Sequence, residues 1–186
     1  MSLPRHISAG RRTALAVLLV AAGLATTRTD QSSADTSERM REIALSDYAT
    51  EPVLVETRAA RRLTFEAWRA DTVEKRAQGL MFVSALAPDR AMIFVYDRPQ
   101  VVAMWMKNTL ISLDMLFVDT AGCVADLHER AIPESLETIQ SAGPVALVVE
   151  LPAGTVEEFG LAVGDRVRRP SADWPPAGPV DCGKRY

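Results

Sequence analysis

The chain contains 186 residues, 48% of them hydrophobic, and carries a formal net charge of −3 at pH 7. This length and apolar content suffice for one ordinary domain with extensions, so we expect a packed core. The acidic balance argues against nonspecific binding to nucleic acid, which requires a basic face, and we expect no nucleic-acid partner.

The N-terminal residues have the pattern of a secretory signal peptide. Arg5, Arg11 and Arg12 precede or open a short apolar run over 13–25, which ends in small residues suited to cleavage. The run is shorter than the roughly 20 residues that a membrane span needs. We therefore predict a signal peptide over 1–25, a periplasmic or secreted location, and no stable membrane insertion after cleavage. An uncleaved signal that anchors the chain is the alternative.

Three further segments are predicted after the signal peptide. Residues 26–51 are polar, rich in Thr, Ser and Asp, and lack a strong period, which indicates a tether. The folded domain is expected over 52–169. Pro and Gly dominate from 170 to 186, so we expect an irregular tail there.

The domain opens with signals for a hairpin and a short helix. Apolar and polar residues alternate over 53–55 and again over 63–67, which predicts two antiparallel strands. A short helix follows, with Asp71 expected as its N-cap and Gly79 as the residue that ends it.

The rest of the domain consists of short apolar runs separated by turn residues. These runs predict strands over 91–96, 101–107, 114–118, 123–128, 145–151 and 166–169. The run over 145–151 is nearly continuous, which is typical of an interior strand. Many short strands favour a closed or two-layer β fold over βαβ units. The predicted fold is mostly β: a single compact β-barrel-like or jelly-roll-like domain with one or two short capping helices.

Several ordered motifs carry a family resemblance. They lie at 74–81, 92–95, 105–109, 113–114, 117–119, 149–154 and 164–167. On these motifs the chain resembles the domain of unknown function 192 family, an uncharacterised conserved family. The resemblance implies a β-barrel-like or jelly-roll-like fold and frequent export, and it implies no chemistry. The chain departs from the family pattern at Ala91, Met104 and Ser112, where the family usually has Gly, an aromatic residue and Pro.

The segment that follows Trp105 is the strongest candidate for a site. Lys107 and Asn108 place a cation and an amide between two apolar runs. Charges inside apolar sequence are costly unless they are paired or used. If the strands before and after this segment pair as antiparallel neighbours, Lys107 lies near Asp114.

Two further charged residues complete the candidate site. Arg76 lies on the predicted helix, and Glu150 lies in the apolar strand, where a buried carboxylate is expected to pair with a cation. The candidate ligand-binding residues are Arg76, Trp105, Lys107, Asn108, Asp114 and Glu150. This set suits an unknown small polar or anionic ligand. A structural network is the alternative, with Asp114 paired to a cation and Asn108 making the turn.

Three functions follow from these residues. The first is a noncatalytic binding or accessory module with a polar pocket at this segment, for which no catalytic residue is predicted. The second is a hydrolase-type enzyme that uses Asp114 and Glu150. The third is a structural domain that binds an envelope protein, which an exposed apolar patch would favour.

The two cysteines could form one disulfide bond. Neither the cysteines, the histidine of the predicted domain nor the methionines indicate a cofactor. Cys123 and Cys182 both follow the signal peptide, and an oxidising compartment would allow a disulfide that holds the tail; two free thiols are the alternative. Cys123 and His128 are an odd number of residues apart, so they face opposite sides of a regular strand and form no local dyad. No ligand spacing for a metal is present, and the methionines are interpreted as core filler, so we predict no metal and no cofactor.

Overall fold

The computed structural model describes residues 43–172, 174–175 and 180–184. The predicted signal peptide and the predicted tether up to residue 42 therefore lie outside the described residues. Among the residues that are described, no helix is long and apolar enough to cross a membrane.

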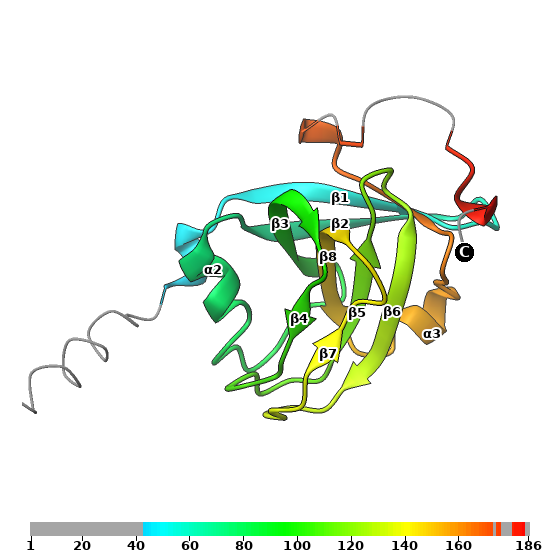
Figure 1. Ribbon diagram of the computed structural model, residues 1–186. Coiled ribbons are helices and arrows are strands. Elements are labelled where there is room, and N and C mark those ends of the chain that lie inside the picture. The colour runs from blue at the N-terminus through cyan, green and yellow to red at the C-terminus, as the bar shows by residue number, and fades with distance from the viewer. Residues whose placement is uncertain (1–42, 173, 176–179, 185–186) are drawn as a thin grey trace, which may run out of the picture. The chain divides into compact units, whose positions relative to one another are not determined.

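The domain is mostly β, with few and short helices (Figure 1). The strands are Thr50–Glu56 (β1), Arg62–Ala70 (β2), Arg90–Gln100 (β3), Ala103–Met104 (β4), Leu113–Val118 (β5), Val124–Ala131 (β6), Ile139–Gln140 (β7), Val145–Pro152 (β8) and Arg166–Arg168 (β9). The α-helices are Val73–Gln78 (α2) and Thr155–Phe159 (α3). Single 3-10 turns cover Leu45–Asp47 (η1), Pro170–Ala172 (η2) and Cys182–Lys184 (η3).

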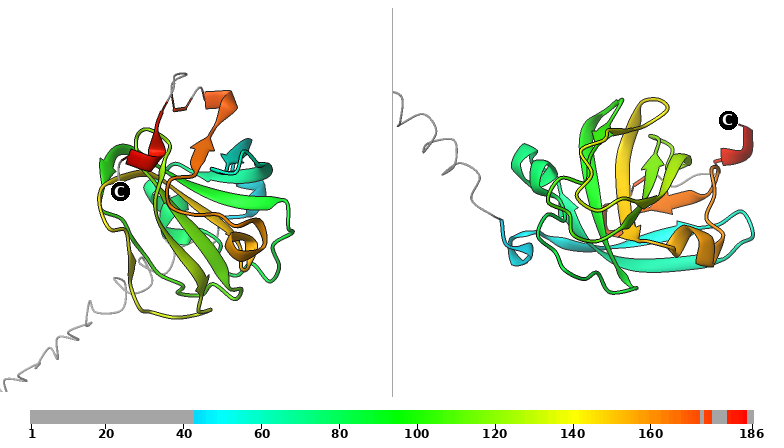
Figure 2. Two further views of the ribbon diagram at one scale, coloured as in Figure 1. Left: turned by 90° about the vertical axis from the view of Figure 1, so that its right-hand side faces the viewer. Right: turned by 90° about the horizontal axis from the view of Figure 1, so that it is seen from below.

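Seven strands form one sheet in the order β6-β5-β8-β3-β2-β1-β9, and β4 pairs with β7 in a separate two-stranded ribbon. The large sheet curls into a half-barrel, as the two further views in Figure 2 show. This architecture confirms the predicted fold class. The predicted hairpin is also confirmed, because β1 and β2 pair as antiparallel neighbours. The pair β2–β3 is parallel, and α2 lies in the connection between these two strands.

Apolar side chains fill both faces of the curled sheet. Successive residues of a strand point to opposite faces, and the buried residues of β8 divide in this way. Val149 and Leu151 belong to one core cluster, whereas Val148 belongs to a second cluster that also contains Phe94 and Met115. Burial on both faces explains why the run over 145–151 is nearly continuous, and β8 is an interior strand as predicted.

Two local predictions are wrong for identifiable reasons. The hydroxyl of Thr72, not the carboxylate of Asp71, caps α2 by accepting the N–H of Lys75, because Asp71 accepts the Nε–H of Arg69 instead. Gly79 ends the helix with a φ of +53°, as predicted. The run over 101–107 forms only the two-residue strand β4, since the chain then enters a turn that alternation alone does not reveal.

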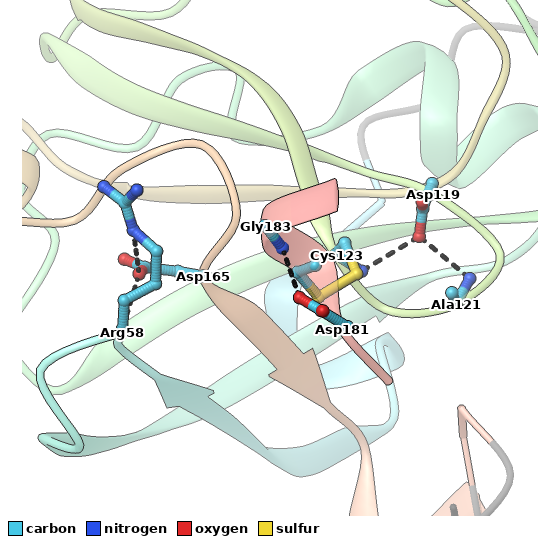
Figure 3. Close-up of a disulfide and its surroundings, with 8 residues drawn as sticks. Arg58, Asp119, Ala121, Cys123, Asp165, Asp181 and Gly183 are labelled. Carbon is cyan, nitrogen blue, oxygen red and sulfur yellow. Dashed lines mark hydrogen bonds and ion pairs between the residues drawn. A yellow bond between two sulfur atoms is a disulfide. The ribbon is translucent and has the colours of Figure 1, made fainter. Parts of the chain in front are cut away.

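The end of the chain is joined to the sheet by a disulfide between Cys123 and Cys182, with a Cα–Cα distance of 5.5 Å (Figure 3). Cys123 lies directly before β6, where the carboxylate of Asp119 accepts the N–H groups of Ala121 and Cys123. Both cysteines are buried. The bond fixes η3 against the turn before β6, so part of the predicted tail is ordered.

Loss of this disulfide is expected to loosen the C-terminal segment. The bond joins residues 59 positions apart, and Cys182 lies in a short segment with little secondary structure of its own. Cys182→Ser should therefore lower the free energy of unfolding by about 2 kcal/mol. Urea unfolding of the oxidised protein and of this variant measures the difference. Equal midpoints for the two proteins would contradict the prediction.

Candidate functional site

The most unusual buried side chain in the domain is Glu150, near the end of β8. Its neighbours in register are Met92 on β3 and Met115 on β5, both fully buried. Alternation along β8 therefore directs a carboxyl group toward an apolar core cluster. The side chain of Glu150 is only 4% exposed.

One oxygen of the Glu150 carboxyl group, Oε2, is buried and has no hydrogen-bond partner among the described residues. Burial disfavours the charged form and raises the pKa of Glu150 to about 8. The carboxyl group is consequently mostly neutral at pH 7 and can act as a hydrogen-bond donor.

This carboxyl group lines a pocket of about 320 Å³. The remainder of the lining comes from α2 and the residues directly after it, from β3, and from β4 with the segment that follows it. The apolar part of the wall includes Leu80, Met81, Phe94 and Met104. Apolar walls with a few polar groups are typical of small-molecule sites, and this volume lies at the small end of their range.

Arg76 contributes the cation of the pocket. Its Nη1 atom donates to the backbone oxygens of Asp71 and Val95, at 2.8 and 2.9 Å, which fixes the guanidinium beside the sheet. The guanidinium also lies over the ring of Tyr96, 5.3 Å from the ring centroid. In the described part of the chain Arg76 forms no ion pair, and the carboxylate of Glu74 interacts with its positive charge only at longer range.

Trp105 and Lys107 lie at the rim of the same pocket. Trp105 lines the pocket and is 50% exposed. The ammonium group of Lys107 lies over the Trp105 ring, 5.3 Å from its centroid. Lys107 does not line the pocket itself, but this contact places its positive charge beside Trp105, which does.

Asn108 has a backbone role. It adopts a φ of +55°, a left-handed conformation that asparagine tolerates better than most residues. Its carbonyl oxygen accepts the N–H of Phe82 at 2.9 Å, and the N–H of Thr109 bonds to Met106 at the same distance. Asn108 therefore makes the turn that carries Trp105 to the pocket rim, which matches the structural alternative for this residue.

The expected antiparallel pairing of the strands before and after Lys107 is wrong. The strand before Lys107 pairs with β7, whereas β5, which contains Asp114, pairs with β6 and β8. Asp114 is fully buried, and its two carboxylate oxygens accept the N–H groups of Arg130 and Val156, both at 2.8 Å. Val156 lies in the first turn of α3, whose N-cap is Gly154 and offers no side chain. Asp114 thus caps α3 and does not line the pocket.

A second hollow of about 370 Å³ lies along β6 and the loop before β7, and none of the six candidate residues lines it. Two acidic residues line it: the carboxylate of Asp126 accepts the N–H groups of Leu127 and Ala142, and Glu137 is exposed to solvent. The pocket containing Glu150 is the better candidate because it combines an unpartnered carboxyl group with an unpaired guanidinium.

Sequence reasoning did not find Tyr96 and Phe94 as pocket residues. Both lie on β3, where Phe94 belongs to a continuous buried run and Tyr96 to the half-buried residues that follow it, so Phe94 could not be distinguished from a core residue. Tyr96 lies within electrostatic reach of both Arg76 and Glu150, since the first lowers and the second raises its pKa, which burial raises to about 12. The one available signal is the hydroxyl of Tyr96 at the end of the apolar run 91–95.

Comparison with known proteins identifies related proteins without an established activity. The family model DUF192, described as Uncharacterized ACR, matches residues 54–169. A solved structure from Sinorhizobium meliloti 1021, described as a proposed transcription regulator, is 40% identical, with a TM-score of 0.66, over 70% of this chain and 98% of its own. A protein of unknown function from Novosphingobium aromaticivorans DSM 12444 is 30% identical, with a TM-score of 0.62, over 69% and 98%. No curated protein matches.

Proposed function

The chain belongs to the uncharacterised DUF192 family, and we propose that it is a noncatalytic binding module whose pocket between α2 and Trp105 holds a small polar or anionic ligand. The observation that carries this proposal is the carboxyl group of Glu150 in the pocket lining, whose buried Oε2 atom has no hydrogen-bond partner among the described residues. A buried polar atom without a hydrogen bond costs about 1–3 kcal/mol, so a ligand that bonds to it recovers stability.

Catalysis by two carboxylates has less support. Both oxygens of Asp114 accept backbone N–H groups, and this residue does not line the pocket that contains Glu150. A general base needs an oxygen within reach of the substrate proton. The pair therefore lacks the arrangement of a hydrolase.

A protein-binding role is the second candidate, and exposed apolar side chains favour it. Phe82, Leu110, Ile132 and Leu136 are each at least 47% exposed. Their loops are joined by backbone hydrogen bonds, from Phe82 to the segment after Trp105 and from that segment to the loop before β7. Such an apolar loop surface suits an envelope protein as partner.

Export to the periplasm or the medium remains part of the proposal. The disulfide between Cys123 and Cys182 supports it, because such bonds persist in oxidising compartments. Fractionation of cells that express the full chain would test the location. A disulfide-bonded protein in the periplasm or medium is expected, whereas a reduced protein in the cytosol would contradict export.

Thermal unfolding of the full chain with a ligand panel tests the binding function. The panel contains organic acids, amines, sugars, nucleotides and metal ions. A ligand that binds only the folded state raises the unfolding free energy by about 2.7 kcal/mol at a hundredfold excess over Kd. Ala77 lines the pocket from the exposed side of α2, so Ala77→Trp should fill the pocket without changing its polar groups.

The control is Glu158→Gln, an exposed glutamate on α3 that is absent from the pocket lining. We expect at least one ligand to stabilise the wild-type protein and the control but not Ala77→Trp. If every stabilising ligand acts equally on Ala77→Trp, or if no ligand stabilises the wild-type protein, the pocket is not a binding site and the apolar loop surface becomes the leading candidate.

A further inference from the structure

We propose that the pocket selects a small monocarboxylate with an apolar body, held between the Arg76 guanidinium and the Glu150 carboxyl group. This inference rests on the proposed binding function and specifies its ligand. It follows from the charge, the hydrogen-bonding capacity and the wall chemistry of the pocket.

The charge of the pocket favours an anion. Glu150 is the one acidic side chain among the described residues that line it, and Arg76 is the one basic side chain. Burial raises the pKa of Glu150 to about 8, so at pH 7 the carboxyl group is mostly neutral and the charge of Arg76 remains. An organic ammonium ion would be repelled by this positive charge. The rings of Tyr96 and Trp105 could attract such an ion, but they already contact the cations of Arg76 and Lys107.

The two polar groups can both donate hydrogen bonds to a carboxylate. Arg76 and Glu150 line one pocket but form no ion pair, so a gap separates the guanidinium from the carboxyl group. A carboxylate in this gap has two oxygens, one to accept from the guanidinium and one to accept from the neutral carboxyl group. This arrangement would satisfy the buried Oε2 atom of Glu150.

The walls favour an apolar body over a polyhydroxyl one. Phe94, Met104 and Trp105 offer aromatic and thioether surface. The side-chain amide of Gln78, which also lines the pocket, is committed to the backbone N–H and C=O of Ile43. Few uncommitted hydrogen-bonding groups remain for the hydroxyls of a sugar.

Binding should therefore depend on the protonation of Glu150. Tyr48 and Tyr96 lie within electrostatic reach of Glu150, and Arg76 is the charged residue that lines the same pocket. Burial raises the pKa values of both tyrosines to about 12, so neither tyrosine titrates between pH 6 and pH 9. Glu150 is the group whose charge changes in that interval.

Calorimetric titration of the full chain tests this inference with three probes of similar shape: phenylacetate, phenylacetamide and phenethylamine. We expect phenylacetate to bind most tightly at pH 7. Its affinity should fall about tenfold between pH 7 and pH 9, because the neutral fraction of a group with a pKa of about 8 falls by that factor. Ionic strength is held constant, and Glu158→Gln should behave as the wild-type protein does.

Two variants separate the contributions of the polar groups. Glu150→Gln keeps a neutral donor and cannot ionise, so phenylacetate should bind it with equal affinity at both pH values. Arg76→Met should weaken phenylacetate by at least about tenfold. Arg76 also bonds to the backbone, so Arg76→Met could fail to fold. In that case Arg76→Lys replaces it. Lysine keeps the positive charge but lacks the two-pronged hydrogen bonding of the guanidinium, so it should weaken phenylacetate binding less than methionine would.

The outcomes distinguish the ligand class from the binding function. Tighter binding of phenethylamine, with an affinity that rises with pH, would overturn the carboxylate and indicate an ammonium site. Failure of all three probes, while another panel ligand depends on the pocket by the Ala77→Trp test, would overturn the ligand class alone. Failure of every ligand in that test would overturn the proposed function itself.

Discussion

Replacing Asp114 with alanine is expected to lower the free energy of unfolding by about 3–5 kcal/mol. The carboxylate is fully buried and accepts the N–H groups of Arg130 and Val156. A hydrogen bond to a charged group contributes about 1.5–3 kcal/mol, and alanine leaves both N–H groups without their acceptor. Denaturation in urea at pH 7 measures the change.

Two further variants provide an intermediate case and a control for Asp114→Ala. Asp114→Asn retains one acceptor oxygen and should fall between the wild-type protein and the alanine variant. Asp97→Ala removes an exposed aspartate and should change stability by less than about 0.5 kcal/mol. If Asp114→Ala unfolds at the wild-type urea concentration, its carboxylate does not hold β5, β6 and α3 together, and a role for Asp114 in function would have to be considered again.

Replacing Glu150 with glutamine is expected to stabilise the protein at alkaline pH. The folded-state pKa of Glu150 is raised from 4.5 to about 8, so the unfolded chain loses this proton at lower pH than the folded chain does. The contribution of Glu150 to stability is therefore largest below about pH 4.5 and falls as the pH rises toward 8. The shift corresponds to a loss on the order of 5 kcal/mol for the wild-type protein.

Glutamine cannot ionise, so this pH-dependent loss should disappear in the variant. The buried amide has a desolvation cost of its own, and we expect a net gain of about 2–3 kcal/mol at pH 8.5. Urea unfolding at pH 5 and pH 8.5 gives the two stabilities. Glu158→Gln should keep the wild-type dependence on pH. A Glu150→Gln variant whose stability falls with pH as steeply as that of the wild-type protein would show that another group titrates.

Regular strands leave a pattern in the sequence, whereas turns held by long-range hydrogen bonds do not. Alternation predicted the hairpin of β1 and β2 and the interior position of β8, because burial on one or both faces leaves a direct pattern in the chain. Alternation failed over 101–107, where a turn held by loop-to-loop hydrogen bonds replaces a regular strand. Such bonds join residues far apart in sequence and leave no local period.

The six candidate residues do not all lie in one place, again because contacts between residues far apart in sequence leave no local pattern. Arg76, Trp105 and Glu150 line one pocket, which their sequence positions do not reveal. Asp114 was grouped with them because it follows Lys107 closely in sequence, but strand order takes its carboxylate to α3 instead. A lone acid in an apolar strand indicated that Glu150 was special. Its expected partner, a cation, is absent among the described residues, and that absence follows only from three-dimensional packing.

The protonation of Glu150 tests the central claim most directly, namely that the pocket holds an unpartnered carboxyl group for a ligand. The carboxyl carbon of Glu150, assigned by comparison with Glu150→Gln, can be followed by NMR from pH 4 to pH 10 with and without phenylacetate. We predict titration near pH 8 in the free protein and at higher pH with phenylacetate bound. Titration near pH 4.5, unchanged by phenylacetate, would contradict the claim, because it would mean that the carboxyl group is solvated or already paired.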